Sequence, residues 1–278
     1  GTKLENKVLS TETGGEAGLY SSSFQNLLRT VYSEYAAGFQ RVVWHVWTAS
    51  YGYGNYKWGG YLSGMPAFYR WGNREPSYQD YDEFNAHIGR VQQLMQTGKS
   101  RTDIGFIHNN WTQGVHTNAE DGTYSQGSKN WQFAHEGVYY RSTELQDHGY
   151  TYDYFSPDYL NNKNVTFNET TKTLESAGYK ALVIYQNWLD VEAAENILGL
   201  AKEGMPVVVL ENAATQTPFN DGNEEELARV MTEMKALSTV RVAKVTDPVA
   251  HNKADTGGFD DEVYEKLQEL GVRPYAEF

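Results

Sequence analysis

The sequence contains no cysteine and no long apolar run, and its basic residues are outnumbered by acidic ones. The lack of cysteine excludes disulfide bonds, thiolate metal ligands and a cysteine nucleophile, but it does not fix the cellular compartment. No apolar stretch approaches the roughly 18–20 residues of a spanning helix, so we expect no membrane span. With 23 Lys and Arg against 36 Asp and Glu, the net charge is −13, which argues against nucleic acid as a partner.

Aromatic residues are abundant, with 21 Tyr and 7 Trp among 278 residues. These side chains offer large flat surfaces with a polar group, which suits stacking on sugar rings as well as core packing. The length predicts one large or two ordinary domains. No signal peptide precedes Lys3, which leaves two alternatives open: a cytosolic protein, or a chain whose start is missing.

The first hundred residues are predicted to form two β/α units. A strand over 7–11 runs into Glu12, and a buried parallel strand is expected over 41–47. Between them, apolar residues spaced three or four apart predict a helix that ends at Gly38, namely Phe24, Leu27, Leu28, Val31 and Tyr35. A second helix is expected from Pro76 to Gly98. Two such units cannot close a barrel or cover a sheet on both faces, so we expect this region to be the end of a larger fold.

The sequence changes character at Arg101, where a second α/β region begins. Strands are predicted at 103–108, 150–154, 181–185, 206–210 and 240–245. Helices are predicted at 133–148, 190–203, 224–237 and 260–270. This alternation is typical of a parallel sheet that is covered by helices on both faces.

The carboxyl ends of the first two strands carry the candidate catalytic residues. Parallel α/β proteins bind ligands beyond these ends, and a right-handed crossover directs Glu12 and His45 to the same side. Glycosidases use two carboxyl groups, and Glu12 is a candidate for one of them. The alternative is that Glu12 caps the glycine-rich turn or the next helix. Glu16, in that turn, is interpreted as a solvated or capping acid rather than the catalytic partner. His45 either contacts a sugar hydroxyl, orients Glu12, or is a hydrogen-bonded core residue.

Aromatic side chains surround this position in the sequence. Strand alternation places Trp44 on the face opposite His45 and Trp47. The loop 51–61 carries five rings that are separated by Gly, Asn and Lys rather than by helical spacing. This favours a wall for sugar stacking, although a loop folded onto its own rings is the alternative. The residues predicted to contact substrate are Trp44, His45, Trp47, Tyr51 and Trp58.

No metal site is predicted. His108, His116, His135 and Glu136 could suggest one, but their spacing fits no standard ligand pattern, and we interpret them as solvated residues. The sequence also lacks a phosphate-binding loop and a dinucleotide fingerprint.

Several blocks of sequence resemble large secreted glycoside hydrolases, in particular the α-L-rhamnosidase-like group, glycoside hydrolase family 106 and its relatives. The blocks are 10–15 (Ser-Thr-Glu-Thr-Gly-Gly), 38–45, 58–61, 90–98, 103–107, 149–160, 179–184 and 201–209. Their order extends over nearly the whole chain, although each block alone is weak.

The resemblance implies an α/β fold in which the last two β/α units of a (β/α)8 barrel, 1–100, precede a flavodoxin-like parallel α/β domain, 101–278. That second domain would be similar to the trimerisation domain of certain β-galactosidases. Glu12 would end the seventh barrel strand and His45 the eighth. The resemblance also implies a secreted or cell-surface protein, an oligosaccharide or glycoside substrate, and the rest of its own longer chain as a partner. It implies no cofactor except calcium, which assists sugar binding in some relatives.

We therefore predict part of a glycoside hydrolase of plant or microbial polysaccharide, rhamnosidase-like in type. The isolated chain is expected to be inactive, because the resemblance implies that the first six barrel strands, and with them the second carboxylate, are absent. The choice between retention and inversion stays open, since it depends on the separation of the two carboxyl groups. One alternative is a non-catalytic carbohydrate-binding or oligomerisation module. Another is an unrelated cytosolic α/β enzyme in which a single doubly wound sheet joins both regions.

Overall fold

The structure is a computed structural model of the chain. It describes residues 8–14, 23–45, 77–97, 101–109, 140, 142, 144–161, 165–175, 178–218, 221–245 and 261–276. The chain divides into two compact units, 1–100 and 101–278.

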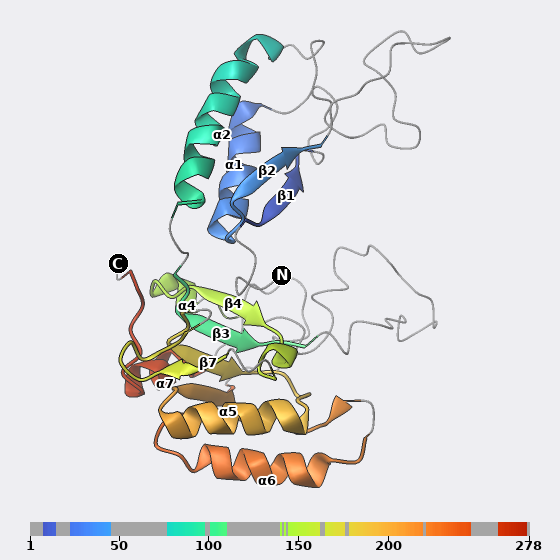
Figure 1. Cartoon of the computed structure of the whole chain (residues 1–278), viewed down its shortest axis with the longest axis vertical. Helices are drawn as coiled ribbons and strands as arrows, with labels where there is room; N and C mark the ends of the chain where they lie inside the picture. Colours follow the sequence, from blue (N-terminus) through green and yellow to red (C-terminus); the bar gives the residue numbers. More distant parts are fainter. Residues whose placement is uncertain are drawn as a thin grey trace, which may run out of the picture. The chain divides into compact units, whose positions relative to one another are not determined.

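The first unit contains a βαβ arrangement followed by a second helix (Figure 1). Its elements are β1 (Ser10–Thr13), α1 (Phe24–Ala36), β2 (Arg41–Trp44), the 3-10 turn η1 (Tyr78–Asp80) and α2 (Tyr81–Met95). β1 and β2 pair in parallel, as the crossover through α1 requires. The second helix begins at Tyr81 rather than at Pro76, because the 3-10 turn takes the preceding positions.

The two helices pack against one face of the small sheet. Ser23 caps α1 by accepting a hydrogen bond from the amide of Asn26, and Gly38, with φ of 96°, ends the turn that follows the helix. The rings of Phe24 and Phe84 stack with 4.3 Å between their centres and join α1 to α2. The buried core of this layer consists of Leu27, Val31, Tyr35, Tyr81, Phe84 and Ile88.

The opposite face of the small sheet is open within the described residues. Side chains along β2 alternate between exposed and partly buried. Val8 and Val43 are 41% and 44% exposed, whereas Val42 packs against the helical core. Parallel sheets are normally covered on both faces, so this unit lacks one layer of cover among the residues that the structure describes.

The second unit is built on a five-stranded parallel sheet with the order β4-β3-β7-β8-β9 (Figure 1). Its strands are β3 (Ile104–Ile107), β4 (Tyr152–Phe155), β7 (Ala181–Ile184), β8 (Val207–Leu210) and β9 (Val240–Ala243). Numbered within the sheet, the order is 2-1-3-4-5, which is the flavodoxin-like order. The parallel sheet expected for this region is confirmed. It shares no strand with the sheet of β1 and β2, so a single sheet joining both regions is not found among the described residues.

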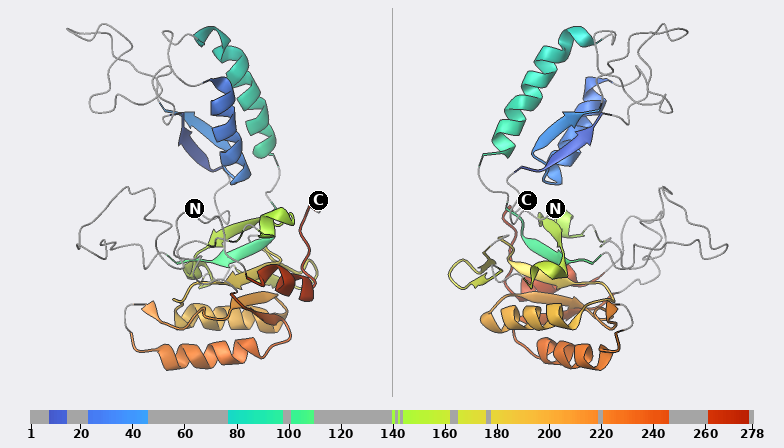
Figure 2. Two further views of the ribbon diagram at one scale, coloured as in Figure 1. Left: turned by 180° about the vertical axis from the view of Figure 1, so that it is seen from behind. Right: turned by 45° about the vertical axis from the view of Figure 1, so that its right-hand side comes forward.

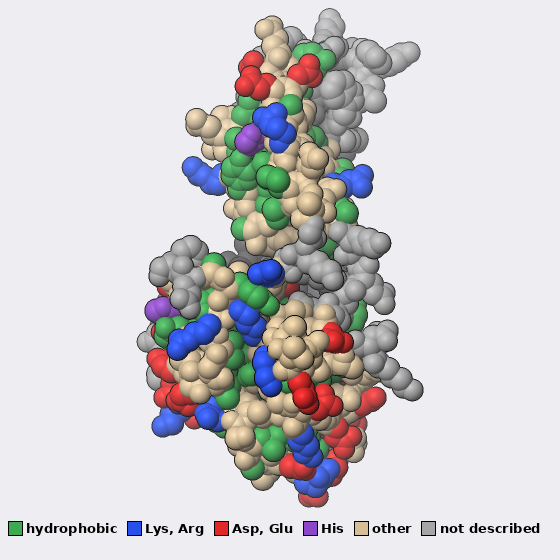
Figure 3. All heavy atoms as spheres, turned by 60° about the vertical axis from the view of Figure 1, so that its left-hand side comes forward, with side chains coloured by type: hydrophobic (Ala, Val, Ile, Leu, Met, Phe, Trp, Pro, Cys, Tyr) green, Lys and Arg blue, Asp and Glu red, His purple; other side chains and the backbone are tan. Residues whose placement is uncertain are grey.

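Helices cover both faces of the five-stranded sheet, with α5 and α6 on one face and α4 and α7 on the other (Figure 2). They are α4 (Glu144–Asp147), α5 (Val191–Glu203), α6 (Glu224–Lys235) and α7 (Val263–Glu269). Asp190 caps α5 through the amide of Ala193, and Gly204 ends it in the left-handed region with φ of 115°. Acidic and basic side chains are mixed on the surface of this unit (Figure 3). Among them, Arg229 pairs with Glu226 and Glu233.

Two details of the second unit differ from the prediction. Of the helix expected over 133–148, the described residues show only α4, at 144–147; Tyr140 and Ser142 are not helical, and the hydroxyl of Ser142 accepts from the amide of Glu144. Residues 133–139, 141 and 143 lie outside the described residues. A small antiparallel hairpin, β5 (Phe167–Asn168) with β6 (Thr173–Leu174), was not predicted. A membrane-crossing helix, long and apolar enough, is absent from the described part of the chain.

Candidate functional site at the ends of β1 and β2

The carboxyl ends of β1 and β2 lie side by side. In the parallel register, Glu12 is opposite Val43 and Thr13 is opposite Trp44. The amide of His45 donates to the carbonyl oxygen of Thr13 at 2.8 Å, which holds the two strand ends together. A site at this position therefore receives side chains from both strands.

Glu12 and His45 face each other across the strand pair. The Nε2 atom of His45 lies 3.9 Å from Oε1 of Glu12. His45 follows Val43 by two residues and therefore shares its face, which is also the face of Glu12. The His45 side chain is 27% exposed and that of Glu12 70% exposed. The structure thus brings together the two residues that the sequence places at neighbouring strand ends.

Trp44 lies on the other side of β2, in the layer between the sheet and the helices. Its ring centre is 5.6 Å from that of Phe84, and its indole N–H donates to Oδ1 of Asn85 at 2.9 Å. Strand alternation predicts this placement opposite His45. The structure therefore separates Trp44 from the carboxylate with which it was grouped as a site residue.

The remaining predicted substrate contacts are Trp47, Tyr51 and Trp58. All three lie outside the described residues, as does Glu16. Their role in sugar stacking stays a prediction.

Contacts on the helical side fix the strand that carries Glu12. The hydroxyl of Thr11 donates to Oε1 of Glu34 on α1 at 3.0 Å. Thr13 is 1% exposed, and Gly14 turns the chain away with φ of 89°. Because Thr11 and Thr13 point to the helices, the intervening Glu12 points to the open face.

A calcium site does not fit the residues that the structure describes. Calcium takes six to eight oxygen ligands, usually including several carboxylates. Among the described ranges, no group of three or more His, Asp or Glu side chains could hold a metal ion. We therefore assign no chemistry to calcium.

A shallow hollow of about 570 Å³ lies along α1. It is lined by Gln25, Leu28, Arg29, Tyr32, Ser33 and Ala36, which recur every three or four residues and so share one side of the helix. Neither Glu12 nor His45 lines it, so the hollow is separate from the candidate site.

The sequence-based prediction missed a second set of strand ends, in the second unit. β3 and β7 are neighbours at the point where the strand order reverses, and open α/β sheets bind ligands at such a point. There, Nδ1 of His108 lies 2.6 Å from the hydroxyl of Tyr185. The amide of Asn109 donates to Oε1 of Gln186 at 2.8 Å, and both side chains are 5% exposed. The signal that could have identified them is the position of His108 at the end of one predicted strand and of Gln186 just after another.

These contacts make the second set of strand ends a weaker candidate than the first. Nδ2 of Asn109 also donates to the carbonyl oxygen of Trp188, so its polar groups form hydrogen bonds within the fold. His108 is partly buried between the rings of Tyr154 and Tyr185, so the prediction that it is a solvated residue is wrong. It belongs to no potential metal-binding group among the described residues. The other residues considered for a metal, His116, His135 and Glu136, lie outside the described residues.

Comparison with known proteins finds similarity in structure only. No protein-family profile and no curated protein sequence matches the chain. Its fold is similar to that of a rhamnosidase from Novosphingobium sp. PP1Y, with a TM-score of 0.57 and 15% identity over 96% of this chain and 23% of that one. An apo exo-carrageenase GH42 from Bacteroides ovatus gives a TM-score of 0.45 and 8% identity over 94% of this chain and 29% of that one.

The likeness to the rhamnosidase shows a shared fold. This chain is a mixed α/β protein with a mostly parallel sheet, and its fold occurs within part of a glycoside hydrolase. It spans about a quarter of the length of the rhamnosidase structure, with 23% of that chain covered.

Proposed function

We propose that this chain is part of a carbohydrate-active glycoside hydrolase and that Glu12 is one of its two catalytic carboxyl groups. The observation that carries the proposal is the pairing of Glu12 with His45 on the open face, at the carboxyl ends of two adjacent parallel strands. Active sites of (β/α)8 barrels lie at this end of the strands.

The open face supports a barrel as the complete form of the first unit. In such a barrel, each strand sends alternate side chains outward to the helices and inward to the barrel interior. Thr11 and Val42 face the helices, whereas Glu12 and Val43 face away from them. If six further β/α units complete the barrel, the exposed Val43 becomes an interior residue. β1 and β2 are then its seventh and eighth strands.

The chemistry expected of Glu12 is that of one member of a carboxyl pair. Glycosidases place an acid on one side of the scissile bond and a base or nucleophile on the other. His45, whose Nε2 lies 3.9 Å from Oε1 of Glu12, would orient this carboxylate or donate to a hydroxyl of a bound sugar. Trp47, Tyr51 and Trp58 would stack on that sugar. We propose a rhamnosidase-like substrate, and a secreted or cell-surface protein that meets its glycoside outside the cell.

The test uses the longer protein that contains this chain, assayed against a panel of aryl glycosides and oligosaccharides. Glu12→Gln should lower kcat by roughly 10²–10⁴-fold, because it removes an acid or base group while keeping the side-chain size. Glu83→Gln, an exposed change on α2, is the matched control and should keep full activity. His45→Asn should cause a smaller loss. Full activity in Glu12→Gln would overturn the assignment.

A second candidate function is a carbohydrate-binding or oligomerisation module without catalysis. The sheet of the second unit, which has helices on both faces, favours it, because such a unit can serve assembly without a reacting group. This reading predicts no turnover in the longer protein and sugar binding that is unaffected by Glu12→Gln. Isothermal titration with the same glycosides separates the two candidates.

A further inference from the structure

A buried carboxylate, Asp103, lies at the amino end of the five-stranded sheet, directly before β3. Its side chain is 1% exposed. Oδ2 accepts hydrogen bonds from the backbone amide and from the hydroxyl of Thr151, both at 2.9 Å. A buried charge is costly unless it is paired and hydrogen-bonded, so the fold depends on the partners that Asp103 finds.

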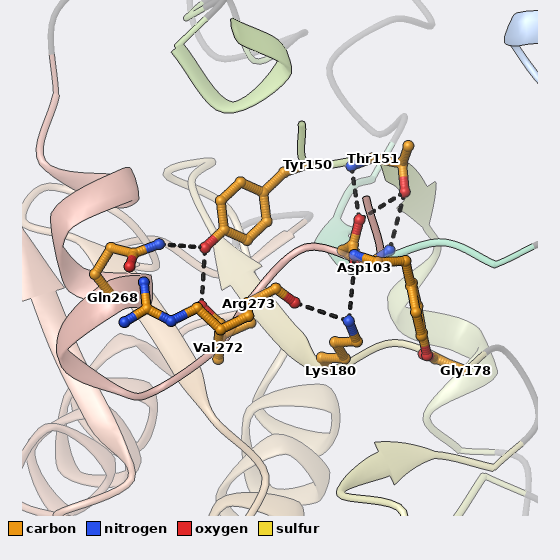
Figure 4. Close-up of polar contacts among 9 residues, drawn as sticks. Asp103, Tyr150, Thr151, Gly178, Lys180, Gln268, Val272 and Arg273 are labelled. Carbon is orange, nitrogen blue, oxygen red and sulfur yellow. Dashed lines mark hydrogen bonds and ion pairs between the residues drawn. The ribbon is translucent and has the colours of Figure 1, made fainter. Parts of the chain in front are cut away.

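The other carboxylate oxygen binds the end of the second unit, residues 272–276, which we call the C-terminal strap (Figure 4). The amide of Tyr275 donates to Oδ1 of Asp103 at 2.8 Å. Nζ of Lys180 lies 3.2 Å from the same oxygen and donates to the carbonyl oxygen of Arg273 at 2.7 Å. Nζ also lies 3.3 Å from the centre of the Tyr275 ring, a cation–π contact. The strap therefore provides partners for both members of the ion pair.

Two further contacts hold the strap in place. The hydroxyl of Tyr150 donates to the carbonyl oxygen of Val272 at 2.8 Å. Burial raises the pKa of Tyr150 to about 12, so this hydroxyl stays protonated and continues to donate. The guanidinium carbon of Arg101 lies 5.4 Å from the centre of the Tyr275 ring. Arg101 is the first residue of the second unit, so the first and last parts of this unit meet around a single carboxylate.

We propose that Asp103 is a lock that couples the docking of the C-terminal strap to the formation of the junction 101–103, so that both ends of the second unit are fixed or released together. When the strap leaves, Asp103 loses the Tyr275 amide and Lys180 loses the Arg273 carbonyl. The buried ion pair is then under-satisfied, which favours opening of the junction as well. Strap and junction should behave as one cooperative opening unit.

Hydrogen exchange followed by mass spectrometry on the full chain tests the lock. Asp103→Asn should accelerate exchange at least about tenfold in peptides that contain the strap, the junction and Thr151, because a hydrogen bond to a charged group is among the stronger ones. Peptides of α5 and α6 should be unaffected. Asp158→Asn, an exposed carboxylate change in the same unit, should leave all of these rates unchanged. Faster exchange in the strap with a fully protected junction, or no change in either, would overturn the proposal.

Further variants keep the test decisive if Asp103→Asn does not fold. Lys180→Met keeps the aliphatic part of the side chain but removes the charge, and should accelerate strap and junction together. Lys202→Met removes a charge from an exposed pair with Glu233 and should accelerate neither. Deleting residues 272–278 leaves every junction residue in the chain but removes the strap, so faster exchange at 101–103 with unchanged exchange in α5 and α6 supports the coupling. Unchanged exchange there refutes the lock.

Discussion

The two units follow the same β/α alternation but bury their strands to different degrees. Every residue of β3, β7 and β8 in the second unit is buried. In the first unit, the residues of β2 alternate between exposed and partly buried. Parallel strands are stable when both faces are covered, and only the second unit meets this condition within the described residues. A β/α pattern therefore predicts the elements, whereas the burial of the strands shows whether a unit is complete.

The largest expected effect comes from separating the two units. Residues 101–278 should fold alone and unfold cooperatively in urea, because their sheet has helices on both faces. Residues 1–100 alone should show no cooperative transition, because a two-stranded sheet with one open face buries too little apolar surface. Circular dichroism and two-dimensional NMR of each fragment provide the measurement.

The opposite result for the first fragment would be informative. A cooperative transition and dispersed NMR signals for residues 1–100 would mean that this unit needs no further strands. The proposed barrel would then lose its main physical support, and the binding-module reading would become the stronger one.

A matched pair of strand substitutions, one buried and one exposed, sharpens the comparison at single residues. Leu182 in β7 is 0% exposed, so Leu182→Ala should lower the free energy of unfolding of the second unit by about 2–5 kcal/mol. Val43 in β2 is 44% exposed, so Val43→Ala should change the stability of this chain by less than about 0.5 kcal/mol. Urea denaturation measures both values. In the longer protein that we propose, the same Val43→Ala should become clearly destabilising; an unchanged small effect there would argue against an interior position.

Local signals explain which parts of the fold could be predicted. The prediction of a helix over 190–203 is confirmed by α5, because Asp190 is an effective cap and Gly204 an effective stop. The hairpin of β5 and β6 escaped prediction because strands of two residues show no alternation. Tyr140 is not helical, and its hydroxyl contacts Asp261, a partner 121 residues away that no local window contains.

The candidate site, like the fold, was predictable where it depends on local sequence. Strand ends and alternation correctly place Glu12 beside His45 and Trp44 on the opposite side of the strand. The lock at Asp103 was not predictable, because its partners Lys180 and Tyr275 come from distant parts of the chain and their identities carry no motif. A residue's neighbours across the sheet depend on strand order, which a single sequence leaves open.

The pH dependence should distinguish the second unit from the first. Burial is the main cause that raises the pKa of Asp261 from 3.8 to about 6, and the charges of Glu144 and Glu265 add to it. The folded state therefore binds the proton more readily than the unfolded state. Stability from this group is greatest below about pH 4 and is lost as the pH rises through about 6. Lowering the pH from about 7 to about 5 should stabilise the second unit by about 1 kcal/mol through this group.

The neutral variant Asp261→Asn isolates this contribution. It should remove the gain between pH 7 and pH 5, while other titrating groups act equally in both proteins. Urea denaturation at several pH values measures the difference. If the free energy of unfolding changes with pH in the same way for both proteins, Asp261 does not titrate in this range.

The smallest expected effect comes from two helix glycines, one in each unit. A Cβ added at Gly89 in α2 or at Gly199 in α5 would meet no atom within 4 Å. Each Gly→Ala change should therefore stabilise its helix by about 0.5–1 kcal/mol, because alanine restricts the unfolded chain. Differential scanning calorimetry should show that Gly199→Ala raises the midpoint temperature of the main unfolding transition and that Gly89→Ala leaves this temperature unchanged. Gly105→Ala is the contrasting case. Its Cβ would lie 2.7 Å from the Tyr179 ring, so this change should lower the midpoint temperature. If Gly89→Ala raises the main transition as much as Gly199→Ala does, the two units unfold together, and the contrast between a complete and an incomplete unit fails.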